Sequence, residues 1–296
     1  MTDHAAKTFV VTGANSGVGL ETARGLARTG GTVVMTARNR EKGEAALADI
    51  RASTGNDKVR LQMLDLASLA SVQRAAEELG DACDRLDVLV NNAGLGTAQP
   101  GRTEDGFELT MGTNHIGPFA LTEALLPHLL DTARRHGEAR IVNVSSLAHN
   151  FARRFDPNEL MPARGTRGRD AYSESKLANL LHARELAARY GEEGLIAHAV
   201  HPGFVDSGFL RPEHFPGPWQ LVNKVTKPLQ ISAVEGAKPS LYAALSDEAG
   251  RLNGFYWVKE RTKPPYLPND VQAVQRQLWA TTEGLIANAR SGAVAA

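Results

Sequence analysis

Tyr172 and Lys176 are four residues apart in a stretch with helical spacing, so both side chains lie on one helix face. A free phenol has a pKa of about 10, which is too high for easy proton exchange at neutral pH. A neighbouring ammonium favours the phenolate and lowers that pKa, as general acid–base catalysis on an alcohol or ketone requires. This spacing is common by chance, so other residues must separate a catalytic pair from an ordinary surface pair.

Polar and small residues follow several apolar runs that are typical of buried strands. Two hydroxyls, Ser145 and Ser146, end one such run and are placed to hold a substrate oxygen. Asn114 lies within a helical stretch, where an amide is a poor helix former and predicts a kink or a bound water. Two further runs end in small residues or in a turn, where a cofactor ring would need close approach: Asn91, Asn92, Ala93 and Gly94, then His201, Pro202 and Gly203.

The first strand-like run leads into a glycine turn and then into a helical pattern. Gly13 allows a tight turn, Gly17 allows the backbone to approach a diphosphate, and Gly19 allows the helix to pack against the sheet. The N-terminus of that helix offers unpaired N–H groups and a positive dipole end to phosphates. A glycine cluster between a strand and a helix favours dinucleotide binding over a plain turn. The predicted contacts are Gly13, Asn15, Ser16, Gly17, Val18 and Gly19.

The end of the second predicted strand indicates which dinucleotide binds. An NAD site usually has a carboxylate there for the ribose hydroxyls, but this sequence has Arg38 and no acid before Glu41. A guanidinium pairs with a 2′-phosphate that a carboxylate would repel, so we predict NADP(H), with NAD(H) as the weaker alternative. The other interpretation of Arg38 is a solvated surface arginine. Asp65 and Leu66, after the third strand, are predicted at the adenine, with helix N-capping as the alternative for Asp65.

Alternating strands and helices must position these residues. Apolar, β-branched runs predict strands at residues 7–11, 32–37, 59–64, 88–91, 141–145, 195–200 and 254–258. Helical patterns cover residues 20–28, 41–52, 69–79, 104–130, 172–190 and 233–245. The alternation predicts an α/β fold with a doubly wound, parallel, seven-stranded sheet and helices on both faces. No repeat or low-complexity linker interrupts it, so we predict a single domain over residues 1–296.

The overall composition excludes several classes of protein. The 33 basic and 33 acidic residues cancel, which argues against nucleic acid or an anionic membrane as a partner. Cys83 is the only cysteine, so an internal disulfide and a cysteine-based metal cluster are excluded. The histidines have no metal-ligand spacing, and no metal is predicted. The sequence has no run of about 18 apolar residues for a membrane span and no room for a signal peptide before Lys7, so we expect a soluble, cytoplasmic protein.

Together these motifs resemble the short-chain dehydrogenase/reductase family over about residues 7–210. The resemblance implies a Rossmann fold in which Tyr172 exchanges the proton of the substrate oxygen and Ser146 holds that oxygen. It also implies that Lys176 lowers the tyrosine pKa and binds the nicotinamide ribose, while Asn114 anchors a water in the proton relay. Ser146 is preferred to Ser145 because the second hydroxyl usually has this role in the family. The matching pieces are Thr12-Gly-x3-Gly-x-Gly, Asn91-Asn-Ala-Gly, Asn114, Ser145-Ser146, Tyr172-x3-Lys176 and Pro202-Gly203.

The resemblance implies further cofactor contacts and a narrower grouping. The contacts are Asn92, Ala93, Gly94, Tyr172, Lys176, Pro202, Gly203, Val205 and Ser207, of which Ser207 replaces a threonine that is usual in the family. Motifs at residues 37–44, 114–117 and 173–179 resemble the retinol-dehydrogenase-like subgroup, as does the long gap between Ser146 and Tyr172. Membrane-bound members of that subgroup have an N-terminal apolar anchor that this sequence does not show, so retinoid chemistry is not implied.

Two segments after strands should shape the substrate site, since ligands bind at the carboxyl ends of strands in open α/β sheets. The first, at about residues 204–230, follows the nucleotide-binding core of about residues 7–200 and is rich in large apolar side chains. It predicts a lid over a lipophilic or aromatic carbonyl or alcohol, or else a segment that packs onto the core. The second, the arginine-rich insert at residues 150–170, is interpreted as a solvated loop, with an acidic substrate group or an anionic surface as alternatives.

The main prediction is therefore an NADP(H)-dependent oxidoreductase that interconverts a small-molecule alcohol and its carbonyl. The alternative is a non-catalytic regulatory protein of the same fold that senses NADP(H), although such proteins typically lose the tyrosine or the lysine. A third interpretation, an epimerase or dehydratase on a nucleotide sugar, needs a larger C-terminal domain than the residues after Val205 could build. Helices 172–190 and 233–245 pair between subunits in many family members, but their outer faces here favour neither a homo-oligomer nor a monomer.

Overall fold

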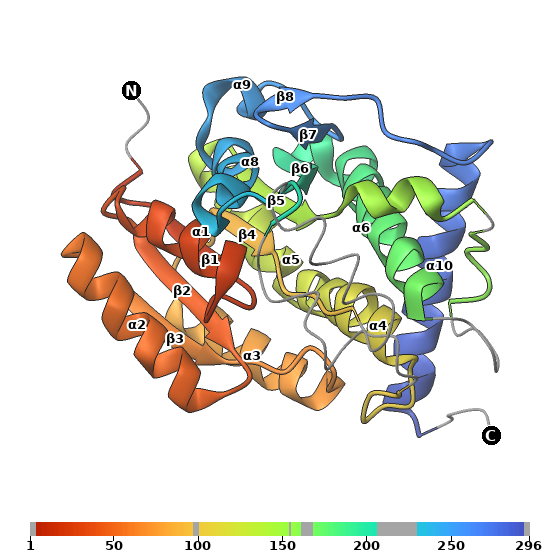
Figure 1. The fold of residues 1–296 in the computed structure, drawn as a ribbon, viewed down its shortest axis with the longest axis horizontal. Helices are drawn as coiled ribbons and strands as arrows, with labels where there is room; N and C mark the ends of the chain where they lie inside the picture. Colours follow the sequence, from red (N-terminus) through yellow and green to blue (C-terminus); the bar gives the residue numbers. More distant parts are fainter. Residues whose placement is uncertain (1–3, 97–100, 154, 161–167, 206–229, 293–296) are drawn as a thin grey trace.

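One sheet forms the centre of the protein in the computed structural model, which describes residues 4–96, 101–153, 155–160, 168–205 and 230–292. Within these residues, eight strands have the order β3-β2-β1-β4-β5-β6-β7-β8, and only the β7–β8 pair is antiparallel (Figure 1). The predicted doubly wound parallel sheet is confirmed, but the count of seven strands is one short. The additional strand, β8 (Arg261–Thr262), is too short to produce an alternating pattern, and it follows a turn with positive φ at Lys259 and Glu260.

The seven parallel strands lie where the apolar runs predict them, with ends that differ by at most two residues. The strand order reverses between β1 and β4, so the connections that leave these two strands diverge and open a crevice at their carboxyl ends. This crevice is where the predicted glycine turn and the Asn92–Gly94 segment lie. The strands are β1 (Thr8–Val11), β2 (Thr32–Ala37), β3 (Val59–Met63), β4 (Val88–Asn91), β5 (Ala139–Val144), β6 (Leu195–His201) and β7 (Tyr256–Val258).

Helices cover both faces of the sheet because successive strand residues point to opposite sides. In β1, Phe9 and Val11 join the apolar core beneath α1 (Gly17–Ala27), α2 (Arg40–Thr54) and α8 (Ala233–Leu245). Val10 joins the core on the other face, beneath α3 (Leu69–Ala82), α5 (Gly117–His136) and α6 (Gly168–Tyr190). A short helix, α9 (Asp247–Gly250), leads from α8 to β7.

The C-terminal helix α10 (Val271–Arg290) packs against α6, on the right of Figure 1, and was not predicted from the sequence. Its buried face mixes the apolar Leu278, Trp279 and Ile286 with the polar Gln275 and Thr282.

The predicted helix over residues 104–130 is wrong in its first part. Residues 103–107 form a turn in which the Thr103 N–H donates to the Phe107 carbonyl at 2.9 Å. The helix begins only with α4 (Leu109–Met111), widens into a π-helical turn at Gly112–Ile116, and continues as α5. The irregularity predicted from Asn114 is therefore this π-helical turn, a feature that is rare and frequent at functional sites.

Parts of two predicted segments lie outside the described residues. The lid is described only at residues 204, 205 and 230, so Ser207 and the apolar residues Phe209, Leu210, Phe215, Trp219, Leu221 and Val222 are not placed. The same holds for Arg154, Arg164 and Arg167 of the arginine-rich insert. Within the ranges that the structure does describe, no helix combines the length and the apolar character needed to cross a membrane.

Candidate active site

The glycine turn between β1 and α1 has the backbone conformation that its sequence predicts. Gly13 and Gly17 have φ values of 64° and 56°, a region that residues with a Cβ rarely adopt. Gly19 packs so closely that a Cβ there would overlap the Gly13 carbonyl and the Asn92 amide. Ser16 is the N-cap residue of α1, yet its side chain makes no capping hydrogen bond. The turn thus fits a dinucleotide whose diphosphate accepts hydrogen bonds from the N-terminus of α1.

Thr12 ties the glycine turn to the loop after β4. Its hydroxyl accepts hydrogen bonds from the N–H groups of Asn92 and Ala93, each at 3.0 Å, and Asn92 Nδ2 donates to the Thr12 carbonyl at 2.8 Å. On the other side, the Ala14 N–H donates to the carbonyl of Thr36 in β2 at 2.9 Å. The predicted cofactor segments after β1, β2 and β4 are therefore held together. Thr12 was predicted only as part of the glycine motif and Thr36 not at all, because a threonine in or beside a strand carries no distinctive signal.

Arg38 directly follows β2, two residues beyond the Thr36 carbonyl that holds the glycine turn, and its side chain is exposed. Among the described residues, its guanidinium has no hydrogen bond or ion pair, whereas Arg40 pairs with Glu44 at 3.6 Å. An exposed cation without a protein partner at this strand end can receive a phosphate from a ligand.

Asp65 and Leu66 follow β3, as predicted for residues near an adenine. Asp65 Oδ1 accepts a hydrogen bond from the Ala67 N–H at 2.9 Å. The alternative interpretation, that Asp65 is the N-cap of the next helix, is wrong because Ser68 caps α3. Leu66 is buried, and a Cβ on Gly117 would overlap its carbonyl, so the π-helical turn and α5 pack directly beneath this loop.

The two serines at the end of β5 contact different neighbours. Ser145 is buried, and its hydroxyl donates to the Lys176 carbonyl at 2.7 Å, which joins β5 to α6. The Ser146 hydroxyl accepts a hydrogen bond from the Ala148 N–H at 3.2 Å and is hydrogen-bonded to the Tyr172 side chain. The structure therefore brings Ser146, and not Ser145, to the Tyr172 hydroxyl.

The Lys176 ammonium lies beside Tyr172 in the interior of the site. Its Nζ is 5.6 Å from the centre of the Tyr172 ring and donates to the Val144 carbonyl at 3.0 Å. A Cβ on Gly94 would lie 3.3 Å from this Nζ. Because Gly94 has no side chain, there is free space next to the ammonium. The spacing of four residues on α6 thus places both side chains at one location, as the sequence predicts.

Asn114 is fully buried in the π-helical turn and is fixed by three hydrogen bonds. Its Nδ2 donates to the Leu95 carbonyl at 2.8 Å and to the Ser175 hydroxyl at 3.1 Å, and its Oδ1 accepts from the Leu95 N–H at 2.7 Å. The same Oδ1 lies 3.3 Å from the position of a Cβ on Gly94, opposite the Lys176 ammonium. The four predicted catalytic side chains are therefore gathered at the carboxyl ends of β4 and β5.

Burial shifts the pKa values of both titratable groups at this location. Desolvation raises the pKa of Tyr172 to about 12, although the hydrogen bond from Ser146 opposes this shift. Desolvation also lowers the pKa of Lys176 to about 8. Burial is the main cause of the shift in the Tyr172 pKa, and the lowering of that pKa by Lys176 stays a prediction. At neutral pH Tyr172 is protonated and can donate a proton, and Lys176 is mostly charged.

The chain after β6 passes the same edge of the sheet and contacts α8. Val205 forms a β-bridge with Ile231, and a Cβ on Gly236 would touch the Val205 side chain and the Pro202 carbonyl. Gly203 has a φ of 93°, which favours glycine at this turn. Three predicted cofactor contacts therefore follow β6: Pro202, Gly203 and Val205. Because β6 pairs in parallel with β5, these residues lie at the same edge of the sheet as Ser146.

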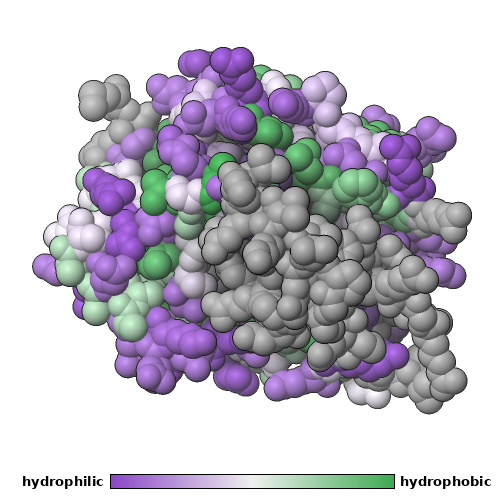
Figure 2. Space-filling view, viewed as in Figure 1, coloured by the Kyte–Doolittle hydropathy of each residue, from purple (hydrophilic) through white to green (hydrophobic). Residues whose placement is uncertain are grey.

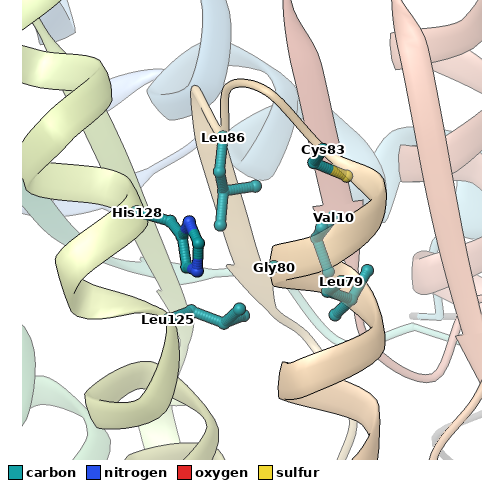
Figure 3. A pocket seen from close by; sticks show the side chains of 7 residues that line it. All are labelled: Val10, Leu79, Gly80, Cys83, Leu86, Leu125 and His128. Carbon is teal, nitrogen blue, oxygen red and sulfur yellow. The ribbon is translucent and has the colours of Figure 1, made fainter.

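A small apolar pocket lies away from this site, between α3 and α5 (Figure 3). Leu86 of the pocket precedes β4, whereas Asn92 follows that strand. The pocket therefore lies near the amino ends of the strands, whereas the candidate site lies at their carboxyl ends. The pocket is lined by Val10, Leu79, Gly80, Cys83, Leu86, Leu125 and His128.

Comparison with known proteins shows the family of this chain. Residues 7–214 match the short chain dehydrogenase family, and the chain belongs to it. Dehydrogenase/reductase SDR family member 13 of Bos taurus is 42% identical to it over 94% of this chain and 73% of the relative. Retinol dehydrogenase 13 of Homo sapiens is 37% identical over 95% of this chain and 84% of the relative. The resemblance to retinol-dehydrogenase-like proteins is thus confirmed, and the protein is an oxidoreductase that acts on CH–OH groups.

Solved structures agree with this assignment. A protein of Mycobacterium paratuberculosis is 37% identical, with a TM-score of 0.72 and coverage of 95% of this chain and 93% of that chain. RhlG of Pseudomonas aeruginosa, solved with NADP, is 26% identical, with a TM-score of 0.68 and coverage of 86% and 96%. The family uses NAD(P)(H), and the positive φ values and close packing of the glycine turn fit such a dinucleotide.

Proposed function

We propose that the protein is an NADP(H)-dependent oxidoreductase that reduces a lipophilic or aromatic carbonyl compound with Tyr172 as the proton donor. The observation that carries this proposal is the Lys176 ammonium 5.6 Å from the centre of the Tyr172 ring, with Ser146 as a hydrogen-bond partner of the Tyr172 side chain. Lys176 and Asn114 approach the same location from α6 and the π-helical turn, on either side of Gly94. A half-buried tyrosine beside a second hydroxyl and an ammonium suits proton transfer to a carbonyl oxygen.

Each of these side chains has a role in the proposed reaction. Ser146 donates a hydrogen bond to the carbonyl oxygen and orients it toward Tyr172, which donates its proton to that oxygen. The Lys176 ammonium and the Ser146 hydroxyl then stabilise the phenolate, which burial alone would disfavour. Asn114, fixed through Leu95, holds a water for reprotonation of the site. NADPH, when bound, supplies the hydride that reduces the carbonyl carbon.

The choice of NADP(H) over NAD(H) is supported by Arg38. Its exposed guanidinium stands at the end of β2, where a ribose 2′-phosphate would receive a charge-assisted hydrogen bond. We expect Arg38→Asp to weaken NADPH binding about 100-fold while NADH binding changes less than about threefold. Fluorescence titration with both cofactors measures this difference. Arg40→Asp is the matched control, since Arg40 is also exposed but pairs with Glu44; equal losses for NADPH and NADH in Arg38→Asp would contradict the assignment.

The lipophilic character of the substrate is supported by apolar side chains around the site. After β5, Leu147 and Phe151 are 49% and 69% exposed, and after β6, Phe204 is 43% exposed. Figure 2 shows apolar surface on this face next to the segment whose placement is not described. Exposed apolar side chains that gather beside a site favour an apolar ligand.

Turnover assays with a panel of carbonyl compounds test the proposed function. Tyr172→Phe retains the ring and removes the proton, so we expect kcat to fall about 1000-fold while NADPH affinity stays within about threefold. NADPH consumption and a fluorescence titration give the two values. Binding of NADPH without turnover of any carbonyl, in both the wild type and Tyr172→Phe, would instead support a non-catalytic NADP(H) sensor.

The single-domain organisation, the cytoplasmic location and the assembly state stay predictions of this proposal. A single unfolding transition by calorimetry would support one domain. Cell fractionation tests the location, and light scattering separates a monomer from a homo-oligomer.

A further inference from the structure

The C-terminal helix α10 is fixed firmly onto the helices that carry the candidate catalytic residues. Its Trp279 is 4.9 Å from the Phe119 ring of α5 and 5.6 Å from the His182 ring of α6. The Arg189 guanidinium covers Trp279 at 4.2 Å from the ring centre. This helix lies beyond residues 7–214, which match the family, so the family match assigns it no role.

One polar contact joins α10 to the π-helical turn. His115 follows Asn114 in that turn, and its Nε2 lies 3.2 Å from Thr282 Oγ1 of α10. His115 and Thr282 are both completely buried, so no solvent can replace either partner. Burial lowers the pKa of His115 to about 4, which keeps the ring neutral at physiological pH.

The other ring nitrogen of His115 connects to the surroundings of Lys176. His115 Nδ1 lies 3.4 Å from Asn179 Oδ1, and Asn179 Nδ2 donates to the Val144 carbonyl at 3.4 Å. The Lys176 ammonium donates to this same carbonyl. Asn179 Oδ1 can only accept, so the neutral ring carries its proton on Nδ1, and Nε2 accepts from the Thr282 hydroxyl, which has the Leu278 carbonyl at 2.8 Å as its other acceptor. In this arrangement a continuous set of polar contacts runs from Thr282 to the acceptor that fixes the ammonium.

We propose that Thr282 is a positioning residue for proton transfer. Through the His115 ring, Thr282 fixes the π-helical turn that contains Asn114. Through the same ring it also fixes Asn179, which shares the Val144 carbonyl with the Lys176 ammonium. Replacement of the Thr282 hydroxyl by a methyl group leaves a buried ring nitrogen without its partner. The wide π-helical turn then loses its anchor on α10, and the Asn114 amide shifts from its hydrogen bonds with Leu95.

Three variants test this proposal, which rests on the proposed catalytic roles of Asn114 and Lys176. Thr282→Val preserves shape and removes the hydroxyl, and Thr282→Ser keeps the hydroxyl. Thr281→Val is the control on the same helix, because the Thr281 side chain is only half-buried and its hydroxyl accepts a hydrogen bond from Gln277 of α10. We expect Thr282→Val to lower kcat about tenfold with KM for NADPH within about twofold, because a small misplacement affects the transition state more than binding. Thr282→Ser and Thr281→Val should stay within about twofold of the wild type in both constants.

A second readout does not depend on turnover. With 15N-labelled asparagine, hydrogen exchange of the Asn114 side-chain amide should be faster in Thr282→Val than in the wild type or in Thr281→Val. A lower Tm in Thr282→Val with unchanged kcat and unchanged Asn114 exchange would overturn the proposal and leave Thr282 a merely structural residue. If the wild type turns over no carbonyl, the proposed function fails, and the exchange rates alone decide: faster exchange supports the positioning role and unchanged exchange overturns it.

Discussion

The nucleotide end and the proton-transfer end of the site are built in different ways. The turn after β1 depends on backbone conformation, with positive φ at Gly13 and Gly17 and no space for a side chain at Gly19. The proton-transfer end depends on buried side chains that are distant in sequence, as in the hydrogen bond from Asn114 to Ser175. Phosphate binding needs N–H groups that any residue supplies, whereas proton transfer needs particular side chains in a desolvated place. More of the chain must therefore be folded to build the second end than the first.

After Tyr172→Phe, the largest expected effect separates the two adjacent serines at the proton-transfer end. Ser146→Ala removes the hydroxyl that contacts Tyr172, and we expect kcat to fall about 100- to 1000-fold, as for the loss of an oxyanion donor. Ser145→Ala instead removes a buried hydrogen bond between β5 and α6, which costs about 1 kcal/mol in the free energy of unfolding. Steady-state kinetics and urea unfolding measure the two quantities. A greater loss of kcat in Ser145→Ala than in Ser146→Ala would reverse the roles of the two serines.

The contrast between the two ends also explains what could be predicted from the sequence. The glycine turn and the Tyr172–Lys176 pair were found because their spacing is local and has a direct geometric meaning. The orientation of the two serines follows from contacts with α6, and a strand pattern alone does not reveal which hydroxyl faces the tyrosine. The pKa of Tyr172 depends on desolvation in the folded chain, which a local spacing does not reveal, so the lowering by Lys176 stays a prediction.

The missed elements have the same explanation. Thr282 of α10 contacts His115 across most of the chain length, and no short pattern connects them. The start of α4 was placed too early: residues 103–107 close into a turn, and Asp105 and Gly106 among them are poor helix formers. The N-capping alternative for Asp65 failed because Ser68, three residues later, is the residue that caps α3.

The next prediction concerns the nucleotide end. Gly19→Ala adds a methyl group that must displace the Gly13 carbonyl or the Asn92 amide, so the turn loses its shape. Overpacking costs about 2 kcal/mol, and we expect NADPH affinity to fall about 30-fold in a fluorescence titration. Gly25→Ala is the matched control, because it makes the same change in α1 but contacts the Leu241 side chain of α8. A similar loss of NADPH affinity in both variants would mean that general destabilisation of α1, and not the shape of the turn, weakens binding.

The smallest expected effect is a pH dependence that comes only from the proton-transfer end. Burial raises the pKa of Tyr172 to about 12 and lowers that of Lys176 to about 8, so between pH 6 and pH 10 only the lysine changes its charge. Carbonyl reduction that needs the Lys176 ammonium should therefore be constant below pH 7 and fall as the pH rises through about 8, by about tenfold from pH 7 to pH 9. The profile of kcat/KM for NADPH reports this titration, because that constant refers to the free enzyme.

Lys176→Arg shows whether this fall belongs to the lysine. A guanidinium stays charged throughout this range, so the variant, although slower, should lose the descending limb near pH 8. If kcat/KM of Lys176→Arg still falls near pH 8, the fall belongs to another group. The reaction would then not require a charged lysine at the proton-transfer end. The nucleotide end should show no such limb, because backbone N–H groups, which do not titrate, bind the NADPH phosphates there.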